Sequence, residues 1–161
     1  MNIPAEKAAL DGDLTIVEQA TGIVLFAHGS GSSRHSPRNQ FVARTLNNAG
    51  LATLLFDLLT PEEELIDMRT AELRFDIDLL AGRLVDATRW TKLQPATRDL
   101  RFGYFGSSTG GGAALVAAAQ LPNDTGAVVS RGGRPDLAGD SLGKVKAPTL
   151  LIVGGEDHVV I

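Results

Sequence analysis

The sequence Arg101-Phe-Gly-Tyr-Phe-Gly-Ser-Ser-Thr-Gly-Gly-Gly-Ala-Ala-Leu-Val-Ala-Ala-Ala-Gln120 decides the fold. It starts with an apolar run of strand length, passes through a glycine-rich turn and continues into an alanine-rich segment typical of a helix. At the turn, Gly106-Ser107-Ser108-Thr109-Gly110 matches G-x-S-x-G, a pattern that holds a serine at the apex of a sharp strand-to-helix turn. A plain glycine and serine turn would give the same five residues, so the rest of the chain must decide whether Ser108 is reactive.

Four other apolar runs have the length of strands buried on both faces of a sheet. They cover residues 22–27, 51–56, 126–130 and 148–153. Near the N-terminus, Asp11-Gly12-Asp13 has the residue types of a hairpin turn, which predicts two short strands over residues 2–9 and 13–18. The chain therefore offers enough strands for one sheet.

Helices are expected between these strands. Ser36 and Pro37 are suited to an N-cap and a first helical position, and Gly50 to a C-cap, which predicts a helix between them. Residues 75–93 show helical periodicity and end before a proline. Residues 58–74 are less regular and are predicted to form a solvated loop or a short helix over the carboxyl edge of the sheet.

Strands that alternate with helices predict a three-layer α/β fold, with a mostly parallel sheet and helices on both faces. At 161 residues the chain is expected to be a single domain with one sizeable core. Sites in such sheets lie at the carboxyl ends of the strands. The loops at 28–35, from Asp57 onward, and at 106–110, 130–136 and 154–158 all fall at that edge, so the functional site is expected there.

A serine nucleophile needs a base, a group that orients the base, and donors for the oxyanion that forms. The backbone N–H of Thr109 is one expected donor, and that of Ser30, in the glycine-bearing loop after residue 27, is the other. Asp157 follows the last strand and is the expected acid, with Asp136 as the alternative. Either aspartate could instead form a turn or cap a helix.

Four stretches of this chain together resemble the dienelactone-hydrolase-like branch of the α/β-hydrolases. They are residues 26–38 (FAHGSGSSRHSPR), 103–110 (GYFGSSTG), 130–137 (SRGGRPDL) and 150–157 (LLIVGGED). The resemblance runs along nearly the whole chain and implies hydrolysis of esters or lactones, with Ser108 as nucleophile and Asp157 as acid. Dienelactone hydrolases proper have a cysteine at the position of Ser108, which moves the expectation toward a more general esterase.

The family's chain order places the catalytic histidine after the acid, beyond one more helix and strand. None of the three histidines of this chain stands there. His28 belongs to the oxyanion loop, His35 precedes a helix cap and His158 is adjacent to Asp157. The prediction is a C-terminally incomplete domain that lacks the final helix, strand and helix and is impaired as an enzyme. A base role for His35 or His158 is the less favoured alternative.

The sequence therefore predicts two alternative functions. One is a serine hydrolase that cleaves a small ester or lactone through an acyl-enzyme. The other is a non-catalytic binding protein on a degraded hydrolase scaffold. His28, Arg131 and Arg134 are candidates for substrate binding, although pairing of the arginines with Asp136 or Asp140 is the favoured interpretation.

The composition and net charge of the chain limit the kinds of partner and cofactor that are expected. A net charge of −4 argues against nucleic acid or an anionic membrane as a partner, and no apolar window is long enough to span a membrane. The chain has no cysteine, its histidines lack zinc-site spacing and no phosphate-binding motif is present, so neither a metal nor a cofactor is expected. The first residues do not resemble a signal peptide, which predicts a cytoplasmic location. Strand 148–153 is expected to be an exposed sheet edge through which the chain could form a homo-oligomer.

Overall fold

A computed structural model describes residues 1–158 and 160. Within them, seven strands form one sheet in the order β1-β2-β4-β3-β5-β6-β7. The strands are β1 (Asn2–Ala5), β2 (Ala8–Thr15), β3 (Gly22–Ala27), β4 (Leu51–Phe56), β5 (Arg101–Ser108), β6 (Thr125–Gly133) and β7 (Thr149–Ile152). The pairings of β2 with β1 and β4 are antiparallel, and the other four pairings are parallel. The mostly parallel sheet expected from the sequence is confirmed.

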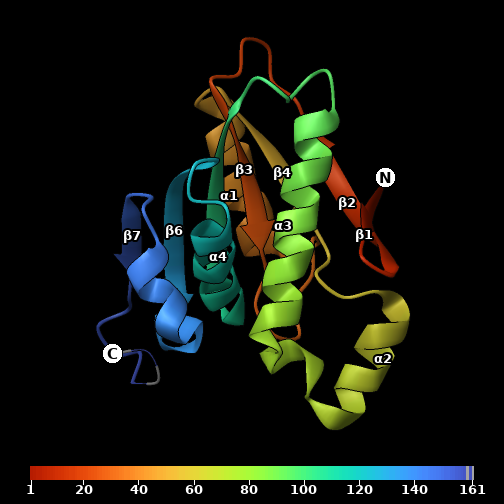
Figure 1. The fold of residues 1–161 in the computed structure, drawn as a ribbon, viewed down its shortest axis with the longest axis vertical. Coiled ribbons are helices and arrows are strands. Elements are labelled where there is room, and N and C mark those ends of the chain that lie inside the picture. The colour runs from red at the N-terminus through yellow and green to blue at the C-terminus, as the bar shows by residue number, and fades with distance from the viewer. Residues whose placement is uncertain (159, 161) are drawn as a thin grey trace.

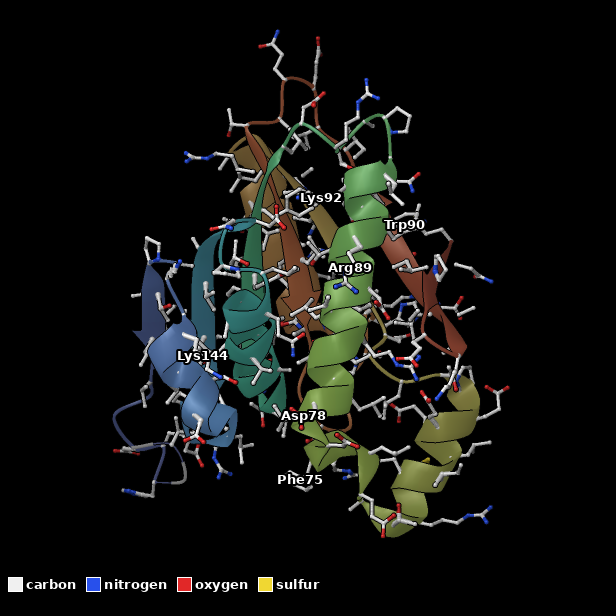
Figure 2. All side chains as sticks on the ribbon, viewed as in Figure 1. Phe75, Asp78, Arg89, Trp90, Lys92 and Lys144 are labelled. Atoms are coloured by element: carbon white, nitrogen blue, oxygen red, sulfur yellow. The ribbon has the colours of Figure 1, made fainter. Side chains whose placement is uncertain are left out.

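Helices cover both faces of the sheet, as predicted (Figure 1). One face carries α3 (Ile77–Leu93) and α4 (Thr109–Gln120), and the other carries α1 (Pro37–Asn48). A shorter helix, α2 (Pro61–Thr70), projects from one end of the molecule and is followed by the 3-10 turn η1 (Leu73–Phe75). Figure 2 shows Arg89 on the side of α3 turned away from the sheet, where its side chain is exposed.

The central strands are buried on both faces of the sheet, because the side chains of alternate residues pack into two different hydrophobic clusters. Leu25 and Tyr104 belong to the larger cluster under α3 and α4, whereas Phe26 and Phe105 belong to a smaller one beside α1. The rings of Phe26 and Phe105 lie 5.1 Å apart between centroids. Burial on both faces explains why the sequence of these strands reads as continuous apolar runs rather than as an alternation.

Helix α4 is the most deeply buried helix in the described part of the chain, with every residue from Thr109 to Ala118 buried. Its glycines and alanines allow this close approach. A Cβ atom added to Gly110 would lie 2.2 Å from the carbonyl oxygen of Ala27 at the end of β3. The helix therefore starts directly on the backbone of the sheet, and only glycine fits at that position.

The N-terminal hairpin differs from the prediction. Its turn is at Glu6 and Lys7, where Lys7 has a φ of 61°, and Asp11-Gly12-Asp13 lies inside β2. The strand packs closely at Gly12, where a Cβ atom would lie 2.7 Å from Cδ1 of Ile3 and 3.1 Å from Cβ of Phe56. The glycine thus marks a close approach within the sheet and not a turn.

The irregular stretch after β4 contains a real helix. Thr60 and Glu63 form a reciprocal capping box at the start of α2, and Arg74 binds the buried Asp67 through its backbone and its guanidinium. A short helix was one of the two structures predicted for this stretch, whereas the sequence prediction missed η2 (Pro135–Lys144), a 3-10 segment that packs on α4.

Strand β7 pairs with β6 along one edge, and its side chains are exposed on both faces. Leu150, Leu151 and Ile152 are 56%, 51% and 45% exposed. This agrees with the expected exposed strand. No helix in the described residues has the length and apolar character needed to cross a membrane.

Candidate active site

Ser108 is the last residue of β5 and the N-cap of α4. Its φ of 51° and ψ of −127° place a non-glycine residue in a strained backbone conformation. Its side chain makes no capping hydrogen bond, so the hydroxyl is not committed to the helix. A Cβ atom on Gly106 would lie 2.5 Å from the carbonyl oxygen of Gly110, so the tight turn depends on glycine.

The loop after β3 packs directly against this turn. A Cβ atom added to Gly29 would lie 2.9 Å from the Cβ of Ser108, so only glycine allows the two segments to approach this closely. Beyond it, the hydroxyl groups of Ser30 and Thr109 lie 3.1 Å apart. The two residues expected to supply oxyanion donors are therefore neighbours beside Ser108.

An open cleft of about 940 Å³ lies over Ser108 at the carboxyl ends of the parallel strands. Asp157, after β7, lines the cleft and is partly buried. A Cβ atom on Gly132 would lie 3.6 Å from Oδ2 of Asp157, so this carboxylate faces the end of β6. The structure thus brings Ser108 and Asp157 to one cleft from strands that are distant in sequence.

Asp136 is poorly placed as the alternative acid. It lies outside the cleft lining, and its two oxygens accept hydrogen bonds of 2.8 and 2.6 Å from the guanidinium of Arg134. These hydrogen bonds from Arg134 hold the pKa of Asp136 below its ordinary value, and those to Asp136 raise the pKa of Arg134. The pair is a surface ion pair.

The three residues predicted to bind substrate have different surroundings in the structure. Arg134 pairs with Asp136, as the favoured interpretation of the sequence had it, whereas Arg131 lines the cleft. His28 is 6% exposed and is occupied by backbone partners: Nε2 accepts from the N–H of Leu58 at 3.0 Å, and Nδ1 lies 3.0 Å from the carbonyl of Gly29. The candidate role of the His28 side chain in substrate binding is therefore corrected, because both ring nitrogens are engaged by backbone groups.

His35 lines the cleft together with Ser108, and His158 is exposed outside the lining. Arg38 was not among the site residues expected from the sequence, and it lines the same cleft from the first turn of α1. Its position one residue after the predicted Ser36-Pro37 helix start, next to a loop at the carboxyl edge, was the available signal. Among the described residues, no group of three or more histidine, aspartate or glutamate side chains is arranged to hold a metal ion.

A strained serine between a parallel strand and a buried helix, with a glycine-bearing loop packed against it, defines the α/β-hydrolase class. The chain belongs to the dienelactone hydrolase family, whose family model matches residues 13–161. The hydrolase fold and the family resemblance expected from the sequence are thus confirmed.

A curated relative from Mycobacterium tuberculosis, present in strains CDC 1551 and H37Rv, is 62% identical over all 161 residues. It is named "Putative phosphoribosyl transferase". The chain spans 35% of the length of that relative.

Among solved structures, a dienelactone hydrolase from Anabaena variabilis is 65% identical with a TM-score of 0.96, covering 99% of this chain and 74% of that one. A dienelactone hydrolase-like promiscuous phosphotriesterase from metagenomic libraries is 18% identical with a TM-score of 0.78, covering 99% of this chain and 69% of that one. The second likeness concerns the fold alone.

Proposed function

We propose that this chain is a serine hydrolase domain that cleaves small carboxylic esters or lactones, with Ser108 as the nucleophile. The observation that carries the proposal is the strained backbone of Ser108, a residue that lines the cleft and whose hydroxyl makes no capping hydrogen bond to α4. Strain of this kind persists only where the surrounding structure enforces it, and it concentrates at functional sites.

In the proposed reaction, Oγ of Ser108 attacks the substrate carbonyl carbon and its proton passes to a base. The backbone N–H groups of Thr109 and Ser30 donate to the oxyanion, which collapses to an acyl-serine as the alcohol leaves with the proton. Water then attacks the acyl-serine and releases the acid. Asp157 is assigned the role of orienting the base, and no step requires a metal or a cofactor.

The base is the missing part of this constellation, and we propose that turnover by these 161 residues is slow. His28 is engaged by the backbone, and His158 lies outside the cleft lining. His35 lines the cleft but lies on an exposed loop, and among the described residues its ring makes no hydrogen bond to Asp157. Loss of a triad member typically leaves a catalysis of about 10³–10⁴-fold over water, which arises from the oxyanion hole and binding.

The phosphoribosyl transfer named for the M. tuberculosis relative is not assigned to this chain. That name belongs to a protein of which the chain spans 35%, and the family match of residues 13–161 is to a hydrolase family. The proposal concerns the hydrolase domain alone.

Labelling with a fluorophosphonate tests the proposal, because this reagent modifies serines that an active site has activated. We expect covalent modification that peptide mapping places on Ser108, loss of labelling in Ser108→Ala and retention in Ser107→Ala, the adjacent serine of the same turn. Hydrolysis of short nitrophenyl esters is expected to be measurable but weak. An unlabelled, folded protein without esterase activity would favour the alternative of a non-catalytic binding protein on a hydrolase scaffold.

A further inference from the structure

Among the described residues, the side chains that line the cleft over Ser108 carry more positive than negative charge. Within the described part of the chain, the lining contains Arg38, Arg131 and one carboxylate, that of Asp157, so the arginines exceed the aspartate by one charge. This contrasts with the net charge of −4 of the whole chain. The excess is therefore local to the cleft.

Ion pairing divides the arginines near the cleft into two groups. Arg34 is bound to Asp57 and Asp13, and Arg134 is bound to Asp136. Across the part of the chain that the structure describes, Arg38 and Arg131 take part in none of the ion pairs. Of these four arginines near the cleft, the two without a carboxylate partner, Arg38 and Arg131, are the two that line it.

Arg131 is held in place by neutral groups. Its Nη2 donates to Oδ1 of Asn39 at 3.4 Å, its guanidinium carbon lies 5.9 Å from the ring centroid of Phe105, and Nε is inaccessible without a hydrogen-bond partner. Asn39 is itself 3% exposed, so the supporting amide is fixed. An amide and an aromatic ring orient a guanidinium but leave its charge uncompensated, which is the state suited to receiving an anion.

We propose that the substrate carries a phosphate monoester group and that Arg38 and Arg131 bind it in this cleft. Guanidinium groups match the geometry of phosphate oxygens, and each of the two arginines can donate hydrogen bonds to them. The cleft of about 940 Å³ exceeds the needs of a short ester and leaves room for such a group away from Ser108. The phosphate is a binding group and stays intact, while the bond that breaks is the carboxylic ester at Ser108.

This inference rests on the proposed function for the identity of the reacting bond, but its binding step can be tested without the reaction. The protein is Ser108→Ala, in which the nucleophile is absent, and the probe is phenyl phosphate, titrated at constant ionic strength and followed by two-dimensional amide NMR. We expect saturable shifts in the loop after β3 and at the ends of β5 and β6. Arg38→Gln and Arg131→Gln, each added to Ser108→Ala, are expected to weaken binding by about tenfold.

Arg134→Gln is the matched control, because Arg134 is paired with Asp136 outside the cleft lining and its loss should leave binding unchanged. Benzoate is the second probe and is expected to bind more weakly than phenyl phosphate. Absence of saturable phenyl phosphate binding would overturn the inference. So would equal weakening in Arg134→Gln, or benzoate binding as tight as that of phenyl phosphate. A failure of fluorophosphonate labelling in the unmodified protein would overturn the proposed reaction. It would not change the interpretation of the phenyl phosphate titration, which does not depend on the reaction.

Discussion

The hydroxyl oxygens of Ser30 and Thr109 lie 3.1 Å apart, which links the loop after β3 to the first residue of α4. These residues are 79 positions apart in sequence. In the proposed mechanism their backbone N–H groups are the two oxyanion donors, so the hydroxyl contact fixes the spacing of the donors. Such a contact is a positioning device, because neither hydroxyl needs to touch the substrate.

Removal of this contact is expected to slow the reaction of Ser108 without unfolding the protein. Ser30→Ala keeps the backbone N–H and removes the hydroxyl of an exposed residue, so we expect a change in stability within about 0.5 kcal/mol. The second-order rate constant of fluorophosphonate labelling should fall about tenfold, since one misplaced oxyanion donor costs up to about 10²–10³ in rate. Ser32→Ala, on the same loop, serves as control, and an unchanged labelling rate in Ser30→Ala would contradict the positioning role.

Two glycine-to-alanine substitutions in helices are expected to change the free energy of unfolding in opposite directions. Gly110→Ala places a Cβ atom 2.2 Å from the backbone oxygen of Ala27, and a backbone overlap cannot be relieved by a rotamer change. We expect a loss of at least about 1–3 kcal/mol in the free energy of unfolding. In Gly82→Ala, within α3, the new methyl group meets no atom within 4 Å, so the gain in helix propensity should stabilise the protein by about 0.5–1 kcal/mol. Urea unfolding of both variants measures the difference, and equal effects would refute the packing argument.

The buried Asp67 predicts a pH dependence of stability. Burial raises its pKa, but hydrogen bonds from the backbone and guanidinium of Arg74 outweigh that effect and leave the pKa below the ordinary value. The native carboxyl thus binds its proton less readily than the unfolded one. Its contribution to stability is complete above the unfolded pKa of about 3.9 and disappears as the pH falls through the native value.

Asp67→Asn removes this contribution. We expect it to lower the free energy of unfolding at pH 7 by about 1–3 kcal/mol, because the buried amide cannot replace the charge-assisted bonds to Arg74. The loss relative to the unmodified protein should shrink below about pH 4. Urea titrations between pH 3 and 7 measure it, with Asp78→Asn, on the exposed start of α3, as control. A difference that is constant across this range would show that ionisation of Asp67 contributes nothing.

The exposed strand β7 predicts self-association of the purified 161 residues. An apolar strand with a free edge tends to pair with another chain, and a second copy offers the same edge. Sedimentation analysis is expected to show a concentration-dependent shift toward dimers or larger species. Leu151→Lys, on β7, should reduce that shift, while Leu93→Lys, an exposed leucine at the end of α3, should not. A monomer at all concentrations would contradict the predicted oligomer.

Much of this architecture could be predicted from local sequence. The glycine-rich turn around Ser108, the apolar runs of β3 and β4 and the Ser36-Pro37 helix start each encode their structure through steric limits and short-range hydrogen bonds. Gly12 shows where this reasoning fails. A glycine can serve a turn or a close contact, and only the position of Ile3 across the hairpin decided between them.

By itself, then, the sequence determined the family, the order of the elements and the serine at the elbow, because backbone sterics and hydrophobic periodicity are properties of neighbouring residues. Only the tertiary structure separated Arg131 from Arg134 and removed His28 from the candidate substrate-binding residues. Those outcomes depend on which partner lies within hydrogen-bond reach: Asp136 for Arg134, Asn39 for Arg131 and the backbone of Leu58 for His28. Partners brought together by a parallel sheet come from loops far apart in the chain, and no local pattern records their distance.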